Sequence, residues 1–561
     1  MKTILTTLNA KYIHTSLALR WLYVANKDSF DLSFKEYTIK EDIEKITEEL
    51  LSSNCNVLGI SVSIWNVAKT KELVTILKER KPELIIILGG PEVSYEPEFF
   101  LNDWNIDYVI TGEGEFVLGQ LLEAIEEGNL DKGIESVSSR KRINRNIAQA
   151  DINQLIELSS PYELEEDRSS IANRLVYFET SRGCPYQCQY CLSSLEKGVR
   201  YFPEDYFQRN LGYLIDNGAK QIKFLDRTFN LNKEHTYSVF DFLIKSYRPN
   251  LSCQFEVYAD LLDDEMINYL NTNLPEKFFR FEIGIQSTYE PTNIAVRRKQ
   301  NFPLLVHNVK KLIDAGKIDL HLDLIAELPY ETFDRFVKSF NDVFALGAKE
   351  VQLGFLKMLR GTNLRRDALR YGYKYDEKAP YEIEYNSDIS RQELDRIHDA
   401  EHALEKFWNS GRFQLTMNVL FNSYFKGKYF ELFDEIGRFY KENNYPHHGY
   451  QLEDLFRYLQ QFLELKNIDL FETLRADYYN NFSRKPQGFW TDQIEKQKKK
   501  QLLYQIGQDK EFLTENDLTR KIVEKQTAID IVSEDMYLLT VFLVEENVTI
   551  RKSIYYRFTD K

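Results

Sequence analysis

The sequence predicts an α/β protein that begins with a doubly wound parallel sheet, continues as a partial (β/α)6 barrel and ends in a mostly helical domain with a small β element. Two stretches alternate short apolar runs with helical patterns, and a polar stretch without periodicity separates them. Near residue 385 the pattern becomes helical and rich in Tyr and Phe. The expected parts are a first domain at residues 1–130, a linker at 131–170, a barrel domain at 171–385 and a C-terminal domain at 386–561.

The first alternating stretch predicts the doubly wound sheet. Apolar runs predict strands at residues 3–8, 32–39, 57–62, 84–88 and 108–110, and helical periodicity predicts helices at 17–24, 43–51, 69–78 and 116–125. In a doubly wound, Rossmann-like sheet, ligands bind at the carboxyl ends of the strands. The loops after the third, fourth and fifth strands are therefore the candidate binding loops of this domain.

These three loops are rich in glycine and small polar residues. They read Ser-Val-Ser-Ile-Trp from Ser61, Gly-Gly-Pro-Glu-Val-Ser from Gly89 and Gly-Glu-Gly-Glu from Gly112. Glycine at a strand end lets the backbone approach a bulky ligand closely, although a tight turn between strand and helix also needs it. The candidate ligand contacts are Ser61, Ser63, Gly89, Gly90, Glu92, Gly112 and Glu113.

The second alternating stretch predicts the barrel. Strands are expected at residues 175–180, 221–225, 253–258, 279–285, 318–325 and 351–355, with helical patterns between them. Such βα units predict a partial (β/α) barrel, whose active site lies at the carboxyl ends of the strands. The loop after the first of these strands holds three of the chain's five cysteines, Cys184, Cys188 and Cys191.

Cysteines at this spacing are ligands for a soft metal centre. A CxxxCxxC loop supplies three of the four ligands that a 4Fe-4S cluster takes, so one iron stays open for another ligand. A structural zinc site would need a fourth ligand from elsewhere, and no second CxxC or His-x3-His pair is nearby. We therefore expect Cys184, Cys188 and Cys191 to hold a 4Fe-4S cluster.

The cysteine loop, with Tyr190 before its last cysteine, resembles the cluster loop of the radical S-adenosylmethionine (SAM) enzymes. With the glycine loops ahead of it, the chain resembles the radical SAM proteins that carry an N-terminal cobalamin-binding domain and, in this case, a C-terminal domain of unassigned function. The resemblance implies that SAM chelates the open iron and that one electron cleaves it to methionine and a 5′-deoxyadenosyl radical. It also implies cobalamin as a cofactor.

Polar residues inside the predicted barrel strands are further candidates, because strands buried on both faces are normally apolar. A satisfied buried hydrogen-bond network would also explain them. The resemblance implies that Asp226 binds the SAM amino group and that Arg297 pairs with the SAM carboxylate, with Arg298 as an adjacent competitor. The other expected SAM contacts are Tyr190, Glu256, Gln286 and Ser287.

Two departures from the family pattern concern the cofactors. The motif Asp-x-His-x-x-Gly, which supplies an imidazole to cobalamin, is absent, and His14 lacks the flanking Asp and Gly. We therefore expect cobalamin to bind without a histidine on its lower face. In the segment that resembles the fifth-strand motif, Glu327 and Tyr330 replace glycines, which puts the fit around the SAM ribose in question.

The composition restricts the partners. A net charge of −15 opposes a broad phosphate-binding surface, so nucleic acid is not expected. The sequence shows no long uncharged apolar run and no cleavable signal, and its odd number of cysteines fits a reducing cytoplasm. The expected partners are a small-molecule substrate and an electron donor such as flavodoxin or ferredoxin.

The C-terminal region gives weaker signals. Helices are expected at residues 391–408, 414–440 and 450–465, and an antiparallel β element at 528–532, 536–545 and 550–558. His398 and His402 lie one helical turn apart without an acidic or cysteine companion, which favours a packed or exposed pair over a metal site. The basic run at 496–501 predicts a solvated helix face.

These features together predict a cobalamin-dependent radical SAM enzyme that methylates an unactivated carbon of a small substrate. The main alternative is a radical SAM enzyme of another reaction type, cyclisation or rearrangement, with a non-methylating or degenerate cobalamin domain. A methylthiotransferase would need three further cysteines in the first domain, where only Cys55 lies. The remaining alternative is a non-enzymatic cluster or corrinoid sensor, which the complete cysteine set disfavours.

Overall fold

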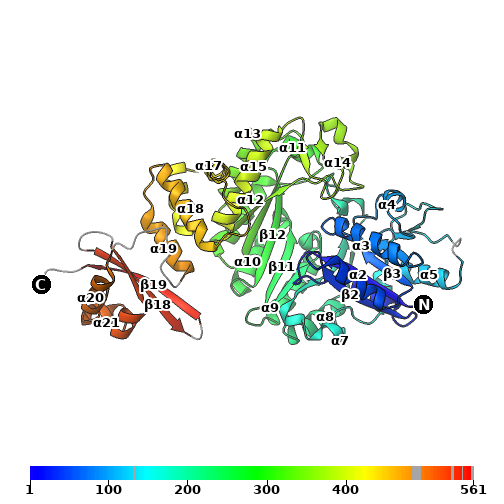
Figure 1. Cartoon of the computed structure of the whole chain (residues 1–561), viewed down its shortest axis with the longest axis horizontal. Helices are drawn as coiled ribbons and strands as arrows, with labels where there is room; N and C mark the ends of the chain where they lie inside the picture. The colour runs from blue at the N-terminus through cyan, green and yellow to red at the C-terminus, as the bar shows by residue number, and fades with distance from the viewer. Residues whose placement is uncertain (130–132, 197, 483–493, 532–535, 546–547, 558–561) are drawn as a thin grey trace. The chain divides into compact units, whose positions relative to one another are not determined.

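The computed structural model divides into two compact units, Met1–Leu394 and Asp395–Lys561. Figure 1 shows the chain coloured from its N-terminus to its C-terminus. The structure describes residues 1–129, 133–196, 198–482, 494–531, 536–545 and 548–557. The predicted boundary at residues 130 and 131 and two predicted strand ends, Val532 and Phe558, lie outside the described residues.

A six-stranded sheet opens the first unit, in the order β2-β1-β3-β4-β5-β6 (Figure 1). Its strands are β1 (Thr3–Asn9), β2 (Leu32–Thr38), β3 (Val57–Ser61), β4 (Ile85–Gly89), β5 (Tyr108–Ile110) and β6 (Val137–Ser138). The first five are parallel, and β6 runs antiparallel to β5. The order reverses between β1 and β3, the point at which doubly wound sheets bind ligands.

Helices cover both faces of this sheet. They are α1 (Leu17–Asn26), α2 (Ile43–Ser52), α3 (Val67–Arg80), α4 (Pro97–Asp103) and α5 (Glu115–Glu126). One apolar layer joins the sheet to α1 and α5 through residues such as Leu19 and Leu122, and another joins it to α2 and α3 through Leu50 and Leu73. The Ser16 side chain accepts from the Leu19 N–H and so caps the start of α1.

The polar stretch between the two sheets contains only the short elements α6 (Ile152–Leu155), α7 (Glu165–Arg168) and η1 (Ile171–Asn173). It is nevertheless packed, because Leu155 is fully buried and the Tyr162 ring stacks on Phe178 with 4.6 Å between centroids. Asp167 Oδ2 accepts from Arg20 Nε of α1 at 2.5 Å. The stretch therefore contacts both the first sheet's helices and the barrel.

The second sheet contains six parallel strands in the order β14-β13-β12-β11-β10-β7. They are β7 (Leu175–Phe178), β10 (Gln221–Phe224), β11 (Ser252–Val257), β12 (Phe279–Gln286), β13 (Asp319–Ala326) and β14 (Glu350–Phe355). β7 and β14 are the two edges, so the barrel is partial, as predicted. The helices between the strands are α8 (Glu204–Asp216), α9 (Lys233–Lys245), α10 (Asp264–Asn273), α11 (Glu290–Ala295), α12 (Phe302–Ala315) and α13 (Phe333–Phe344).

Side chains of the barrel strands alternate between an apolar and a polar face. Phe255 and Phe281 are fully buried and contact Phe240 of α9 on the helix side. The opposite face carries ion pairs between nearby strands and within β13, and these explain polar residues in strands that would otherwise be apolar. The pairs are Lys223–Glu282 at 2.9 Å, Arg280–Glu350 at 2.8 Å and His321–Asp323 at 3.0 Å.

Several short elements complete the first unit. An antiparallel pair, β8 (Ser181–Gly183) with β9 (Val199–Tyr201), flanks the cysteine loop and was not predicted, because three residues carry too little pattern. A second antiparallel pair is β15 (Lys374–Tyr375) with β16 (Ile383–Tyr385). The remaining elements are η2 (Leu192–Leu195), η3 (Phe229–Leu231), η4 (Ala259–Leu261), α14 (Asn363–Arg366) and η5 (Ala368–Tyr371).

The second unit is mostly helical and ends in the antiparallel sheet β17-β18-β19, so the predicted composition of this region is confirmed. Its helices are α15 (Arg391–Leu404), η6 (Glu405–Asn409), α16 (Gln414–Val419), η7 (Leu420–Phe425), α17 (Tyr429–Glu442), α18 (Leu452–Leu465), α19 (Phe471–Asn481), α20 (Lys496–Ile506), α21 (Lys510–Glu515) and α22 (Arg520–Lys525). Its strands are β17 (Thr527–Ile531), β18 (Met536–Glu545) and β19 (Val548–Arg557).

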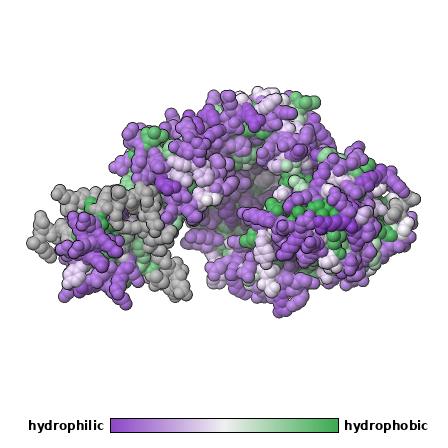
Figure 2. All heavy atoms as spheres, in the orientation of Figure 1, coloured by the Kyte–Doolittle hydropathy of each residue, from purple (hydrophilic) through white to green (hydrophobic). Residues whose placement is uncertain are grey.

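The face of the first unit drawn in Figure 2 is mostly hydrophilic, with apolar residues in small groups. Within the described part of the chain, no helix is long and apolar enough to cross a membrane. All five cysteines carry free thiols.

Candidate functional site

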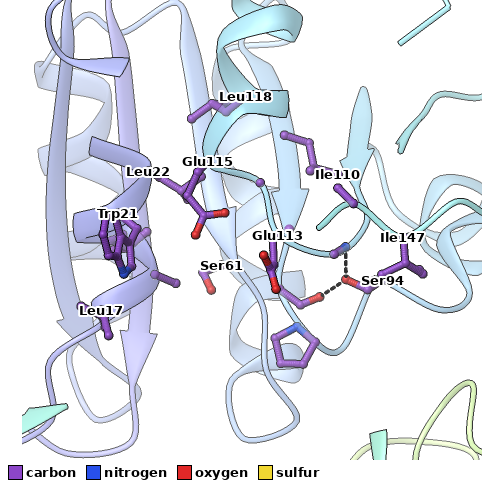
Figure 3. Close-up of a pocket in the computed structure, with 18 of the residues that line it drawn as sticks. Leu17, Trp21, Leu22, Ser61, Ser94, Ile110, Glu113, Glu115, Leu118 and Ile147 are labelled. Carbon is purple, nitrogen blue, oxygen red and sulfur yellow. Dashed lines mark hydrogen bonds between the residues drawn. The ribbon is translucent and has the colours of Figure 1, made fainter. Parts of the chain in front are cut away.

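A cavity of about 400 Å³ opens at the carboxyl ends of β3, β4 and β5. Helix α1 forms one wall, and residues 147–149 and the start of the barrel continue it. A concave site with mostly apolar walls and a few polar groups is typical of cofactor binding. Figure 3 shows the apolar side chains that surround it: Leu17, Trp21, Leu22, Ile110, Leu118 and Ile147.

Two glycines shape the loops beside this cavity. Gly90 and Gly112 have φ values of 102° and 87°, which side-chain-bearing residues rarely adopt. A Cβ on Gly90 would lie 2.6 Å from the carbonyl oxygen of Val62, so no larger residue fits there. Ser94 Oγ donates to the Gly90 carbonyl at 2.8 Å and accepts from the Gly112 N–H at 3.1 Å (Figure 3). This hydroxyl ties the two loops together.

An ionic network lies where the cavity meets the barrel. Arg182 lies 3.1 Å from Glu113, 2.8 Å from Glu115 and 2.8 Å from Glu179. Burial raises the pKa of Glu115 against the effect of Arg182, and Glu115 Oε2 is buried without a hydrogen-bond partner among the described residues. Because Glu115 lines the cavity, this oxygen can accept from a ligand amide, a group that cobalamin carries around its ring.

Five of the seven predicted cobalamin contacts line this first cavity, namely Ser61, Gly89, Gly90, Gly112 and Glu113. Burial would raise the pKa of Glu113, but the guanidinium groups of Arg200 and Arg182 hold it below its usual value.

The other two predicted cobalamin contacts, Ser63 and Glu92, do not line this cavity. The Ser63 N–H donates to Asn66 Oδ1 at 2.8 Å in the turn before α3. Glu92 is 4 % exposed and accepts from the hydroxyl of Tyr381 in the barrel domain. The chain turns away from the cavity at both places, which residue type alone does not reveal.

The cysteine loop borders a second cavity, of about 270 Å³, which all three thiols line. The Gln189 N–H donates to the Val296 carbonyl at 2.9 Å, and the Gln189 carbonyl accepts from Leu364 N–H at 3.0 Å, so neighbouring segments fix the loop's backbone. Among the described residues, no three His, Cys, Asp or Glu side chains are placed to hold one metal ion. A cubane cluster instead binds each thiolate through a different iron.

Arg298 faces the thiols across this second cavity and is 7 % exposed. Its Nη1 donates to the Tyr258 hydroxyl at 2.9 Å and its Nη2 donates to the Gly284 carbonyl. Tyr258 stacks on Tyr186 of the cysteine loop, with 4.4 Å between ring centroids and 8° between planes. These neutral partners orient the guanidinium and leave its charge for an anionic ligand such as a carboxylate.

Three of the six predicted SAM contacts, Tyr190, Glu256 and Gln286, line the second cavity. Burial raises the pKa of Glu256. Gln286 Oε1 is buried without a hydrogen-bond partner among the residues that the structure describes. Both side chains are therefore able to accept from hydroxyl or amino groups of a ligand in this cavity.

Two other predicted SAM contacts, Arg297 and Ser287, do not line the second cavity. Arg297 has a φ of 53° and an exposed side chain, whereas its neighbour Arg298 points into the cavity. Ser287 is fully buried and its Oγ donates to Glu331 Oε1 at 2.6 Å, outside the cavity. The backbone turn at Arg297 decides which of two adjacent arginines faces the thiols, and the sequence left that choice open.

Asp226, the predicted contact of the SAM amino group, is held by neighbouring hydrogen-bond donors. Its carboxylate accepts from the Thr180 N–H at 3.0 Å, the Thr180 hydroxyl at 2.7 Å and the Ser181 hydroxyl at 2.6 Å. Burial raises its pKa to about 6, although these hydrogen bonds oppose the rise. Asp226 therefore supports the backbone that leads into the cysteine loop and does not line either cavity.

The two residues that replace glycines in the fifth-strand segment keep the conformation of glycine. Glu327 has a φ of 71° and Tyr330 a φ of 65°. Such values are uncommon for residues with side chains, so the surrounding structure must hold them. Tyr373 Oη donates to the Glu327 carbonyl at 2.6 Å and Asn386 Nδ2 donates to it at 3.0 Å. Glu327 and Tyr330 thus replace the glycines of the motif but keep a positive φ.

Ser193 and Arg227 line both cavities, so the two spaces meet at these residues. Arg227 forms no ion pair with any other described residue, although Glu196 and Glu256 feel its charge. Neither residue was predicted. Their positions in the sequence could have indicated both residues, because Ser193 lies two positions after the last cysteine and Arg227 directly follows Asp226.

Three family models match successive parts of the chain. The B12 binding domain matches residues 4–122, the radical SAM superfamily matches 178–343, and a protein family of unknown function (DUF4080) matches 369–552. The chain thus carries, in this order, a B12-binding domain, a radical SAM domain and a C-terminal domain of unknown function. These domain types imply a 4Fe-4S cluster, SAM and cobalamin, so the resemblance seen in the loops is confirmed.

Curated relatives include proteins described as methyltransferases. An uncharacterized methyltransferase of Pyrococcus horikoshii is 29% identical over 207 residues, which cover 35% of this chain and 44% of that protein. The cobalamin-dependent radical SAM methyltransferase TokK of Streptomyces tokunonensis is 26% identical over 324 residues, covering 53% of this chain and 46% of TokK. The matched stretch spans less than half of either relative.

Solved structures share the architecture. The cobalamin-dependent SAM radical enzyme OxsB superposes with a TM-score of 0.60 at 15% identity, covering 89% of this chain and 82% of OxsB. The radical SAM methyltransferase TsrM of Kitasatospora setae gives a TM-score of 0.55 at 16% identity, covering 67% of this chain and 77% of TsrM. At these identities the likeness is one of fold, and it confirms the predicted fold class.

Proposed function

We propose that the protein is a radical SAM enzyme that cleaves SAM reductively, depends on cobalamin and methylates an unactivated carbon of a small substrate. The observation that carries the proposal is the common wall of the two cavities at Ser193 and Arg227. A substrate bound there lies within reach of ligands in both cavities, which lowers the entropic cost of reaction. When bound, the cluster supplies the electron that cleaves SAM, and cobalamin supplies the methyl group.

In this proposal the residues of the second cavity hold the cluster and SAM. Cys184, Cys188 and Cys191 bind three irons, and Arg298 pairs with the SAM carboxylate. Gln286 and Glu256 accept from the SAM amino group or ribose hydroxyls, a role that fits the unpartnered Gln286 Oε1. Arg227, at the common wall, faces an anionic group of the bound ligands.

The first cavity is the proposed cobalamin site. Among its described lining residues there is no histidine or cysteine, so we propose that cobalamin binds without a protein imidazole or thiolate on its lower face. His14 is engaged elsewhere, with its Nδ1 2.9 Å from the Tyr177 hydroxyl. Glu115 Oε2 and the carboxylate of Glu113 accept from corrin amides in this proposal.

The proposed reaction needs a small-molecule substrate and an external electron donor, for which flavodoxin or ferredoxin would serve. Five free thiols and a cluster that oxygen destroys favour the reducing cytoplasm as the site of action.

An anaerobic assay with methyl-labelled SAM tests the proposal. Protein reconstituted with iron, sulfide and cobalamin should form 5′-deoxyadenosine with dithionite as reductant and should transfer the label to substrate or to cobalamin. The triple variant Cys184→Ala, Cys188→Ala, Cys191→Ala should lose both activities and its iron, because no thiolate ligands remain in the loop. Cys55→Ala is the matched control, since Cys55 is buried in the core of the first sheet.

The alternative reaction types give a different result in the same assay. Deoxyadenosine formation without any transfer of label would favour cyclisation or rearrangement. Cyclisation is retained as the alternative because the chain is 29% identical over 125 residues to the anaerobic magnesium-protoporphyrin IX monomethyl ester cyclase of Synechocystis. Retained SAM cleavage in the triple cysteine variant would refute the cluster assignment itself.

A further inference from the structure

The barrel domain carries an exposed patch of arginines and apolar side chains that does not belong to the cysteine loop. Leu369 is 94% exposed, Ile294 68% and Tyr330 47%, and exposed apolar side chains that gather in one place mark interaction surfaces. Helices α11 and α14, which flank the patch, lie beside each other at the upper end of the barrel in Figure 1. The patch, called the rim patch below, consists of Ile294, Arg297, Tyr330, Arg366, Leu369 and Arg370.

The members of the rim patch come from three segments that meet at Tyr371. The rings of Tyr330 and Tyr371 are 5.6 Å apart, and the Arg370 guanidinium lies 5.2 Å from the Tyr371 centroid. Burial raises the pKa of Tyr371, and the positive charges of Arg370 and Arg297 oppose that rise. Arg297 therefore lies close to the other two segments although it is far from them in sequence.

The rim patch is positively charged in a protein whose net charge is −15. Among the described residues, none of its three arginines forms an ion pair with a carboxylate. Asp367 acts on the neighbouring Tyr371, and Asp388 Oδ2 accepts from the Tyr330 N–H at 2.8 Å. A local positive surface on an acidic protein attracts an acidic partner and orients it as it approaches.

The rim patch is connected to the cysteine loop by two backbone hydrogen bonds. Gln189, which follows Cys188, donates from its N–H to the carbonyl of Val296, and its carbonyl accepts from the Leu364 N–H. Val296 precedes Arg297, and Leu364 lies two positions before Arg366. Cys188 is thus separated from the exposed Arg297 by one hydrogen bond and two peptide links.

We propose that the rim patch is the docking surface for an acidic protein that donates one electron at a time. The position fits this partner because backbone hydrogen bonds join the segments of the rim patch to the cysteine loop, while the rim patch lines neither cavity. The apolar members supply contact area and the arginines select the acidic face of the donor.

The inference rests on the proposed function, because reductive cleavage of SAM needs an electron that the chain does not contain. In each event the donor is oxidised by one electron. SAM takes up that electron as its C5′–sulfur bond breaks, giving methionine and a 5′-deoxyadenosyl radical, which then abstracts a hydrogen atom from substrate.

Binding of flavodoxin, an acidic one-electron carrier, tests the surface directly. Flavin fluorescence or calorimetry should show that the double variant R366E/R370E binds oxidised flavodoxin on the order of tenfold more weakly than wild type at low salt. High salt should weaken wild-type binding and reduce the difference, because exposed charges are screened. The control K40E/K45E changes the net charge equally on the exposed surface of the first domain and should bind normally.

Deoxyadenosine formation with two reductants separates this inference from the proposed function. With dithionite, R366E/R370E should match wild type; with reduced flavodoxin, it should be slower by a similar factor. Equal flavodoxin affinity and rate in R366E/R370E and K40E/K45E would overturn the docking surface. Absence of deoxyadenosine with dithionite in wild type would overturn the proposed function instead. The milder pair R366Q/R370Q gives the same test if charge reversal lowers the iron content.

Discussion

Arg297 and Arg298 are adjacent in sequence and face different surroundings. The positive φ of Arg297 turns its side chain to the surface, while Arg298 is buried against Tyr258 and the Gly284 carbonyl. Both carry the same charge, so their roles follow from backbone geometry alone. One arginine lies in the rim patch and the other lies in the cavity that holds the thiols.

The two arginines should therefore respond differently to loss of charge. Arg298→Gln should weaken SAM binding by about tenfold or more, since the carboxylate of SAM would lose a desolvated partner. Arg297→Gln is the matched control and should bind SAM as wild type does. Anaerobic titration of the reconstituted protein, followed by calorimetry or by the EPR spectrum of the cluster, measures both affinities. A loss confined to Arg297→Gln would restore the original assignment of that residue.

Asp226 gives the stability of the protein a pH dependence. Its pKa of about 6 in the folded state exceeds the value of about 3.9 that an unfolded aspartate has. The folded state therefore binds this proton more tightly, and the resulting stabilisation is complete below about pH 4 and is lost as the pH rises through about 6. From about pH 5 to about pH 7.5 the wild type should lose about 1 kcal/mol more stability than Asp226→Asn. Urea unfolding at several pH values measures the difference; parallel profiles would contradict it.

At the scale of elements, the hairpin of β8 and β9 holds both ends of the cysteine loop. Gly183 has a φ of 93°, and a Cβ there would collide with the carbonyl oxygen of Gly198, the residue before β9. Gly183→Ala should therefore open the hairpin, destabilise the protein by on the order of 2 kcal/mol or more and lower its iron content. Iron analysis and thermal unfolding measure both effects.

Gly198 provides the control for that substitution within the same hairpin. Its φ is 77°, but a Cβ there would meet no atom within 4 Å. Gly198→Ala should cost about 1 kcal/mol from backbone strain and should keep its iron. Equal iron loss in the two variants would show that the collision with the Gly198 carbonyl oxygen is not the cause.

The sequence predicts the long elements well because each spans enough residues to show its period. The parallel strands of both sheets were predicted within one or two residues of their ends, whereas the short antiparallel strands β6, β8, β9, β15 and β16 were missed. The three cysteines of the loop line the second cavity, and Gly89, Gly90 and Gly112 line the first. Their positions could be predicted because each belongs to a short contiguous motif. Glu92 and Asp226 do not line the cavities, because each bonds to a residue far away in sequence, Tyr381 and Thr180, and local pattern does not reveal such contacts.

At the scale of the whole molecule, both cavities are built from the first unit. Their described lining residues all lie between Leu5 and Asp323, and the rim patch ends at Arg370. The meeting of the two cavities at Ser193 and Arg227 depends on the packing of the first sheet against the barrel. No motif in either domain predicts that contact, so the structure alone brings the two halves of the site together.

This division predicts that cofactor binding does not need the second unit. A chain that ends at Ser390, before α15, retains every described residue that lines the two cavities and the apolar cluster around Tyr190 and Tyr371. It should bind iron and cobalamin in the same ratios as the full chain and form deoxyadenosine with dithionite. Metal analysis, the corrinoid spectrum and the dithionite assay measure these properties. A shortened chain that folds, by circular dichroism, but holds no cobalamin would show that the second unit helps to build the site.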